Sequence, residues 1–134
     1  MSAEALGERL LEFAARIVAV VDASPKRNRS SRPLGEQLLR AGTAVGANFE
    51  ESRGAESRAD FAHKMQVALK EAREARYWLR LIARTKLLDS KSLAPLLQES
   101  LEIILILSKS VATLKGKSRP RRATPAPAEE ESPV

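Results

Sequence analysis

Apolar residues recur every three or four positions through four segments of this 134-residue chain. That spacing places them on one face of a helix, so it predicts amphipathic helices rather than strands. The predicted helices cover residues 3–21, 31–54, 57–86 and 90–114, the last beginning at Ser90 or Ser92. The polar segment 22–32 contains Pro25 and is predicted to be a loop. We therefore expect an all-α, up-down-up-down antiparallel four-helix bundle over residues 1–114.

Each predicted helix has an apolar face that would line the core. The first face consists of Leu6, Leu10, Phe13, Ile17 and Val20 or Val21, and the second of Leu34, Leu38, Val45 and Phe49, with Ala41 and Gly42 between them. The third face consists of Phe61, Met65, Ala68, Ala72, Ala75, Leu79 and Ile82, and the fourth of Leu97, Leu101, Ile104, Ser108 and Val111. Ser31 and Ser57 are predicted N-caps, and Pro33 and Pro95 fall in first turns.

Two glycines lie four residues apart inside the second predicted helix, at Gly42 and Gly46. Glycine costs a helix interior about 1 kcal/mol relative to alanine. Close approach of another backbone is a packing reason to accept that cost, so we expect both glycines to face a neighbouring helix. Arg40 and the carboxylates that follow exclude a membrane-spanning helix here.

The residues around these glycines also carry a family resemblance. Arg40 is followed by small residues up to Ala47-Asn48 and then by a glutamate, and further on come Lys70-Glu71-Ala72 and Tyr77-Trp78-Leu79. Over roughly residues 10–114 the chain resembles bacterial four-helix bundle proteins, which include proteins encoded by intervening sequences inside 23S rRNA genes. More distantly, it is similar to the accessory variability protein of diversity-generating retroelements. The resemblance implies a non-enzymatic bundle, often a ring of five subunits, with a role in binding nucleic acid.

Composition narrows the functional classes. The chain has no cysteine, which excludes disulfides, thiolate catalysis and cysteine-based zinc sites and fits a reducing cytoplasm. The N-terminus lacks the pattern of a signal peptide, and the longest apolar run, Ile103–Leu107, is too short to span a bilayer. A net charge of +6 and a pI near 10.1 favour acidic partners, of which nucleic acid is the commonest.

A basic stripe is predicted on the third helix. At 100° per residue its five cations fall within about 120° of one another; they are Lys70, Arg73, Arg76, Arg80 and Arg84. Nucleic-acid phosphates would suit such a stripe, with assistance from Arg40. The alternative is a solvated face whose charge is balanced by Glu71, Glu74 and neighbouring helices.

The composition changes after Leu114, so residues 115–134 are predicted to be a disordered tail. Its first part is basic, through Lys115, Lys117, Arg119, Arg121 and Arg122, and Glu129–Glu131 follow near the end. An electrostatic arm for RNA or DNA and a merely solubilising tail remain equal alternatives.

The third and fourth helices carry more apolar surface than one core face needs. The additional residues are Trp78, Leu81, Ile103, Ile106 and Leu107. A subunit interface would bury them, and a wide core with the fourth helix near its centre is the alternative. The resemblance alone suggests a pentamer, since the sequence gives no subunit number.

Polar residues near the core face are expected to be structural rather than chemical. Asn48, Glu51 and Glu71 are expected to fix helix register or satisfy neighbouring helices, and contact with a ligand or partner is the alternative. Asp60 and His63 share a helix face, but the chain has a single histidine and cannot build a di-iron site of the bundle type. We expect no metal, no cofactor and no catalytic residues.

These observations favour a cytoplasmic, non-catalytic homo-oligomer that binds nucleic acid, RNA in particular, through a basic helix face, with no membrane partner. The alternative is a structural adaptor for a protein such as a reverse transcriptase. Salt dependence discriminates the two, because phosphate contacts weaken steeply as salt rises and apolar contacts do not.

Overall fold

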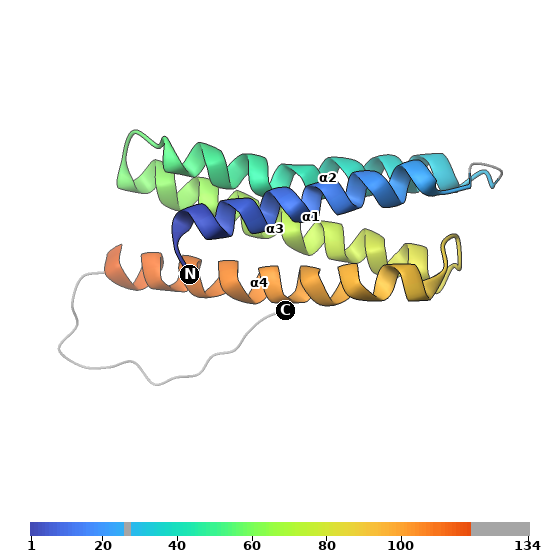
Figure 1. The fold of residues 1–134 in the computed structure, drawn as a ribbon. Helices are drawn as coiled ribbons and strands as arrows, with labels where there is room; N and C mark the ends of the chain where they lie inside the picture. The colour runs from blue at the N-terminus through green and yellow to red at the C-terminus, as the bar shows by residue number, and fades with distance from the viewer. Residues whose placement is uncertain (26–27, 119–134) are drawn as a thin grey trace.

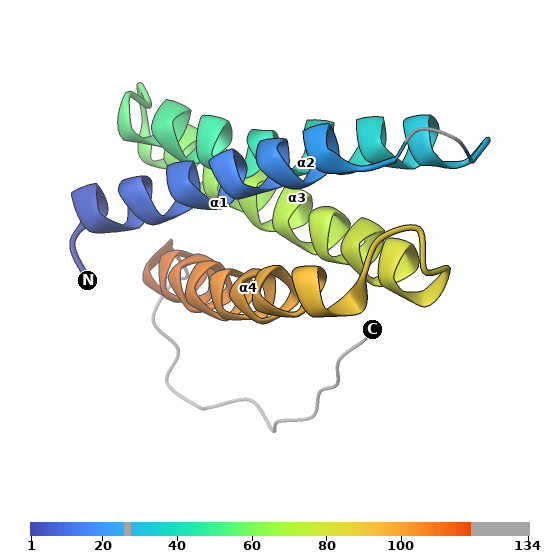
Figure 2. The ribbon, with the colours of Figure 1, turned by 45° about the vertical axis from the view of Figure 1, so that its right-hand side comes forward.

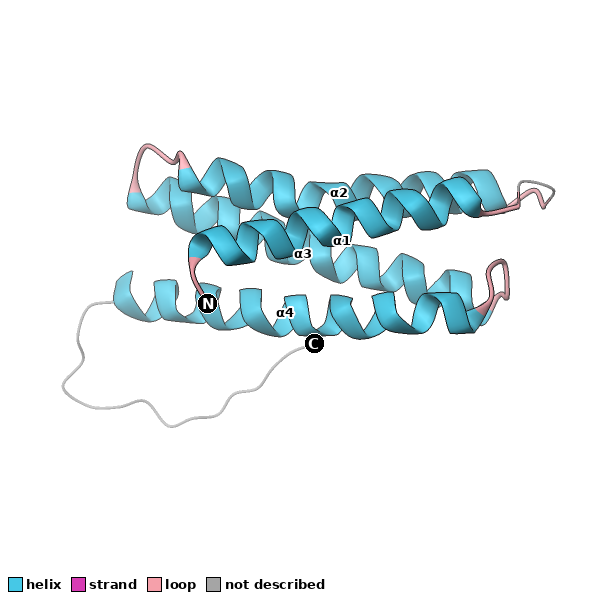
Figure 3. Ribbon diagram, viewed as in Figure 1, coloured by secondary structure: helices cyan, strands magenta, loops and turns pink. Residues whose placement is uncertain are grey.

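The structure, a computed structural model, describes residues 1–25 and 28–118, with side chains through residue 116. These residues form four helices and no strand: α1 (Ala3–Ala23), α2 (Ser31–Arg53), α3 (Arg58–Arg84) and α4 (Ser90–Ser118). Consecutive helices run in opposite directions (Figure 1), and short loops connect them (Figure 3). The predicted all-α four-helix bundle is confirmed. α4 continues through Ser118 rather than ending near Leu114, and the predicted tail from residue 119 lies outside the described residues.

Serine hydroxyls cap two of the helices, and at the start of α1 Ser2 Oγ accepts a hydrogen bond from the Ala5 N–H at 3.0 Å. Ser57 caps α3 as predicted, because its Oγ accepts a hydrogen bond from the Asp60 N–H at 3.0 Å, while Asp60 Oδ2 accepts from the Glu56 N–H at 3.3 Å. The prediction of Ser31 as the cap of α2 is wrong. Ser30 takes that position without a side-chain cap bond, and the buried Ser31 hydroxyl has no hydrogen-bond partner among the described residues.

A left-handed residue turns the chain from α3 into α4. Lys86 has φ 61°. Its N–H donates to the Ala83 carbonyl at 3.2 Å, and the Leu87 N–H donates to the Ile82 carbonyl at 3.2 Å. This pair of bonds is the Schellman arrangement that satisfies the last carbonyls of a helix. The chain therefore reverses direction here without a glycine.

The core faces of α1, α2 and α3 are the predicted ones. Leu10, Phe13 and Ile17 of α1 are completely or almost completely buried, and α3 buries an alternating row from Met65 to Ile82. Three of the α3 core positions are alanines: Ala68, Ala72 and Ala75. Small residues let helix axes approach closely, and α2 and α3 form the most extensive helix pair of the bundle.

Gly42 and Gly46 of α2 both face α1, as the predicted close packing requires. A Cβ at Gly42 would lie 2.4 Å from Ile17 Cδ1, and a Cβ at Gly46 would lie 3.4 Å from Leu10 Cβ and 3.6 Å from the Leu10 carbonyl. α1 therefore packs closely against α2 at these two glycines.

The predicted core face of α4 is only partly correct. Ile104 and Val111 are buried, but Leu97 and Ser108 are half-buried and Leu101 is exposed. The face that meets the core is instead formed by Leu93, Leu96, Ser100, Ile103, Ile104, Leu107 and Val111. The physical reason is that residues 103–107 are apolar on every side of the helix, so their periodicity does not select one face.

The observed core face of α4 also corrects the predicted subunit interface. Ile103 and Leu107 have no exposed surface and belong to the intramolecular core, as the wide-core alternative held. Trp78, Leu81 and Ile106 are half-buried. Among the described residues, the large apolar side chains that reach solvent are Met1, Leu11, Val18, Tyr77, Leu101 and Leu105.

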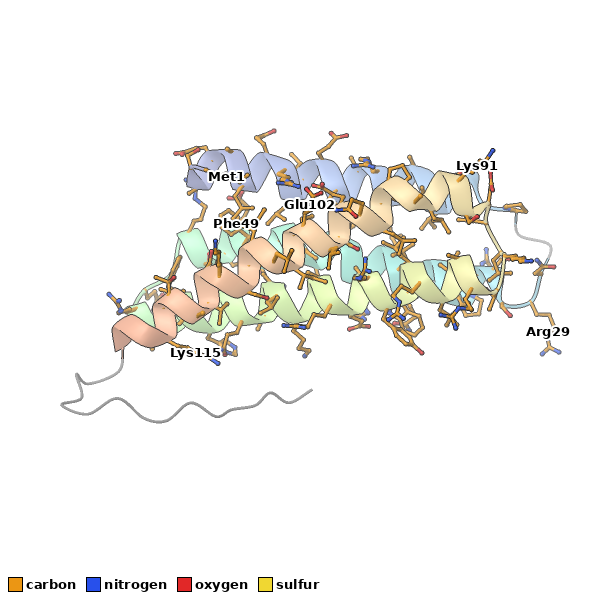
Figure 4. The ribbon with its side chains drawn as sticks, turned by 90° about the horizontal axis from the view of Figure 1, so that it is seen from below. Met1, Arg29, Phe49, Lys91, Glu102 and Lys115 are labelled. Atoms are coloured by element: carbon orange, nitrogen blue, oxygen red, sulfur yellow. The ribbon has the colours of Figure 1, made fainter. Side chains whose placement is uncertain are left out.

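α4 crosses the other helices obliquely, so its C-terminal end lies away from the start of α1 (Figures 2 and 4). Of the neighbouring helix pairs, α1 and α4 make the fewest close approaches. A groove of about 470 Å³ opens between them, lined by Leu6, Phe49, Met65 and Leu114 among others. No described helix is long and apolar enough to cross a membrane.

One arginine joins α1 to α4. Arg9 Nε lies 2.7 Å from Glu99 Oε2, and Arg9 Nη2 lies 2.6 Å from Glu102 Oε1. Hydrogen bonding to Glu99, and then to Glu102, raises the pKa of Arg9 above its ordinary value. The Gln98 amide, and then Arg9, lowers the pKa of Glu102, which lies on the side of α4 towards α1 (Figure 4). Partial burial and fork geometry make this pair stronger than an ordinary surface ion pair.

Candidate nucleic-acid interface

The α3 helix separates its charges onto two sides. Its core face is apolar, its α2 side carries Glu71 and Glu74, and its outward side carries the predicted basic stripe. This arrangement follows from sequence spacing, because residues three, four and seven apart share a helix face. What the sequence left open is whether the carboxylates neutralise the stripe.

The carboxylates of α3 are instead paired with α2. Arg40 Nη1 lies 3.3 Å from Glu71 Oε1, and Arg40 Nη2 is also ion-paired with Glu74. Glu71 is 13% exposed, so its charge is directed into this contact rather than towards the stripe. The alternative in which Glu71 and Glu74 balance the basic stripe is therefore not supported by the geometry. This contact between α2 and α3 is of the kind expected for Glu71.

Arg40 does not belong to the free basic surface. It was expected to assist phosphate binding, but two carboxylates already neutralise its guanidinium at the α2–α3 contact. Arg40 therefore joins α2 to α3, and an incoming phosphate would have to compete with both carboxylates for its half-exposed side chain.

Four of the five stripe residues are exposed and have no ion pair in the described part of the chain: Lys70, Arg73, Arg80 and Arg84. Arg76 behaves differently. Its Nη1 donates to the Leu97 carbonyl at 2.6 Å and to Ser100 Oγ at 3.3 Å, so it anchors α3 to α4. The predicted phosphate-binding role of Arg76 is therefore corrected to a structural one, although its side chain still lines the surface beside Arg73 and Arg80.

We call Lys70, Arg73, Arg80 and Arg84 the basic face. An open groove of about 370 Å³ runs along it, lined by Arg73, Arg76, Tyr77, Arg80, Leu101 and Ile104. A smaller groove of about 230 Å³ continues beside Tyr77, Arg80, Leu81 and Arg84. Tyr77 lies between the two grooves and is 54% exposed. The sequence interpretation missed Tyr77 as a site residue, although its spacing from Arg73 and Arg80 signals the shared face.

The predicted tail cations lie at the far end of α4. Lys115 is exposed there (Figure 4), and Lys117 lies within the last turn. Arg119, Arg121 and Arg122 are outside the described residues. The expectation that the tail forms an electrostatic arm stays a prediction.

The remaining polar residues have local partners. Glu51 pairs with Lys64 of α3 at 2.8 Å, and this contact raises the pKa of Lys64. Asn48 donates to the Ala44 carbonyl of its own helix at 2.9 Å rather than to a neighbouring helix, which corrects the expected contact. His63 is exposed, and no group of three or more His, Cys, Asp and Glu among the described residues could hold a metal ion.

Comparison with known proteins places this arrangement in a family. A family model described as 23S rRNA-intervening sequence protein matches residues 7–109, which span most of all four helices. The chain belongs to the 23S rRNA-intervening sequence protein family. The match covers Arg40 and the whole basic face, so the residues that carried the sequence resemblance lie inside it.

A solved structure supports the same assignment for this family member. It is a crystal structure of a protein of unknown function from the S23 ribosomal protein family of Bacteroides thetaiotaomicron VPI-5482. The two chains are 35% identical, the match covers 84% of this chain and 99% of the other, and the TM-score is 0.74. No protein with a curated description matches the chain significantly.

Proposed function

We propose that this family member is a non-catalytic, cytoplasmic homo-oligomer that binds nucleic acid, RNA in particular, through the basic face of α3. The observation that carries the proposal is the separation of charge on that helix. Arg40 occupies the two carboxylates of α3 on the α2 side, while Lys70, Arg73, Arg80 and Arg84 face solvent. Uncompensated cations in a row attract the phosphate backbone and release its counterions.

Self-assembly would strengthen such binding. A ring or other closed oligomer would repeat the basic face once per subunit, and later contacts would form at high effective concentration. Leu11, Val18 and Leu105 are large apolar side chains at the surface that an interface between copies would cover. Light scattering tests this part: a species well above 14.7 kDa is expected, and a monodisperse monomer would refute it.

The binding proposal is tested with a triple substitution that leaves the anchors intact. Replacing Arg73, Arg80 and Arg84 by Gln removes three charges and retains side-chain length and helix propensity. The variant should bind RNA more weakly, and its log affinity should fall less steeply with log salt, by up to about 2 in slope for three lost contacts to a single strand. Its melting temperature should change little, because these side chains are exposed.

A matched control removes three charges elsewhere. Arg32, Lys91 and Lys109 are exposed, have no ion pair among the described residues and lie off the basic face. Their replacement by Gln should leave most of the affinity and the salt slope unchanged. Equal losses in both triple variants would show that only net charge matters. If the parent protein binds neither RNA nor DNA at low salt, the proposal is overturned, and the protein-adaptor alternative, with a reverse transcriptase as one partner class, takes its place.

A further inference from the structure

Tyr77 is the most exposed aromatic side chain of the described residues, and it lies in the middle of the basic face. Arg73 precedes it by one turn, and Arg80 and Arg84 follow it by about one and two turns. Phosphate contacts alone need cations and do not need an aromatic ring. Proteins that bind single-stranded nucleic acid instead combine an exposed aromatic ring with nearby cations. Bases stack on the ring and phosphates contact the cations.

The Tyr77 ring packs against the ring of Trp78. Its centroid lies 5.0 Å from that of Trp78, with an interplanar angle of 77°, which is an edge-to-face contact. Trp78 Nε1 donates to Glu74 Oε2 at 3.1 Å, and Glu74 is in turn paired with Arg40 of α2. A chain of contacts from α2 therefore limits the rotation of Tyr77, which reduces the entropy lost when a ligand stacks on it.

Open space lies on both sides of the ring. The groove of about 370 Å³ extends towards α4, and its lining includes the apolar side chains of Leu101 and Ile104 together with Arg73 and Arg80. The second groove, of about 230 Å³, extends towards Leu81 and Arg84. From Arg73 to Arg84 the helix rises about 16 Å. At roughly 3.4 Å per stacked nucleotide this length accommodates four or five nucleotides.

We infer that the basic face binds unpaired RNA, with one base stacked on Tyr77 and the flanking phosphates on Arg73, Arg80 and Arg84. This inference rests on the proposed function and names its substrate class. In a duplex the bases are stacked on one another and cannot reach a side chain that projects from a helix surface, so only phosphates would be contacted. The site therefore prefers single-stranded to double-stranded RNA. Trp78, Glu74 and Arg40 act as positioning residues.

The test compares Tyr77→Leu, which keeps an apolar side chain without a ring, with Tyr77→Phe, which keeps the ring. Binding to a labelled ten-nucleotide oligo(U) and to an RNA duplex is measured by fluorescence anisotropy at the same salt. The parent should bind the single strand more tightly. The affinity of Tyr77→Leu for oligo(U) should be about five-fold or more below that of the parent, while its affinity for the duplex should hardly change. Tyr77→Phe should retain the parent affinity for both.

A second readout is specific to the site. Trp78 is the only tryptophan of the chain and touches the Tyr77 ring, so oligo(U) binding should change its fluorescence in the parent and in Tyr77→Phe. The stacking inference is overturned if Tyr77→Leu binds oligo(U) as tightly as the parent, or if its affinity falls equally for duplex and single strand. The proposal that the basic face binds phosphates would then still stand. If the parent binds no nucleic acid, the proposed function fails as well. Thermal melts of each variant establish that it is folded.

Discussion

Gly42 and Gly46 allow one packing argument to be tested on a single helix. Both lie on the side of α2 that meets α1, and alanine at either position should gain about 1 kcal/mol from helix propensity. The two sites differ in the space beside them. A Cβ at Gly46 finds ordinary contact, 3.4 Å from Leu10 Cβ, whereas a Cβ at Gly42 would lie 2.4 Å from Ile17 Cδ1 and 3.2 Å from Ile17 Cγ2.

The expected effects therefore have opposite signs. Gly46→Ala should raise the free energy of unfolding by about 0.5–1 kcal/mol. Ile17 has no exposed surface, so its displaced methyl group has little free space to enter. Overpacking of this kind typically costs about 1–3 kcal/mol, which exceeds the propensity gain, and Gly42→Ala should be destabilising by up to about 2 kcal/mol. Each kcal/mol should shift the melting temperature by about 4 °C.

A double-mutant cycle identifies Ile17 as the cause. Ile17→Val removes the Cδ1 atom and should cost about 0.5–1.5 kcal/mol in the parent. In the Gly42→Ala background the same change relieves the clash, so its cost should largely disappear. Urea denaturation at one fixed protein concentration measures all four proteins, since assembly would make the transition concentration-dependent. The reasoning is refuted if Gly42→Ala stabilises as much as Gly46→Ala, or if Ile17→Val costs the same in both backgrounds.

Helix capping and the Arg9 cluster give two further predictions. Ser57→Ala removes the hydroxyl that accepts from the Asp60 N–H and should lower the free energy of unfolding, measured by urea denaturation, by about 1 kcal/mol. Ser30→Ala loses no side-chain cap bond and should change the free energy of unfolding by less than about 0.5 kcal/mol. Equal losses in the two variants would contradict the assignment of Ser57 as the capping residue. The pKa of Glu102 is lowered from its ordinary value of 4.5 by Gln98 and then Arg9, so its contribution to stability is present above pH 4.5 and is lost as pH falls through the lowered value. Glu102→Gln should therefore flatten the dependence of melting temperature on pH below 4.5, and an unchanged slope would argue against this cluster.

Three helices could be predicted from the sequence almost residue by residue because each has one narrow apolar face. Around Leu10 and Leu79, apolar residues recur at helical spacing and charged residues such as Arg9 and Arg80 lie between them, so only one face can be buried. α4 lacks that contrast. Its residues 103–107 are apolar all round, and whether Leu101 or Ile103 meets the core depends on where α3 lies, which periodicity does not contain.

The sequence predicted the row of cations on α3 but not the different roles of its residues. The helical spacing was sufficient to bring Arg73, Arg80 and Arg84 together. It could not show that Arg76 reaches a carbonyl of α4, or that Arg40 is neutralised from α3, because both contacts join residues distant in the chain. Tyr77 was overlooked because its importance comes from being exposed, and exposure of an aromatic on a half-apolar helix is decided by neighbouring helices.

The oblique path of α4 has a consequence for motion in the bundle. α1 and α4 share few close approaches, and the Arg9 contacts with Glu99 and Glu102 are the principal polar contacts between them. Opening along this pair breaks less packing than opening along α2 and α3, so it is the least costly partial unfolding of the fold. Amide hydrogens at the beginning of α1 and the end of α4 should then exchange with solvent through openings far smaller than global unfolding, while those at the middle of α2 and α3 exchange only when the whole domain unfolds.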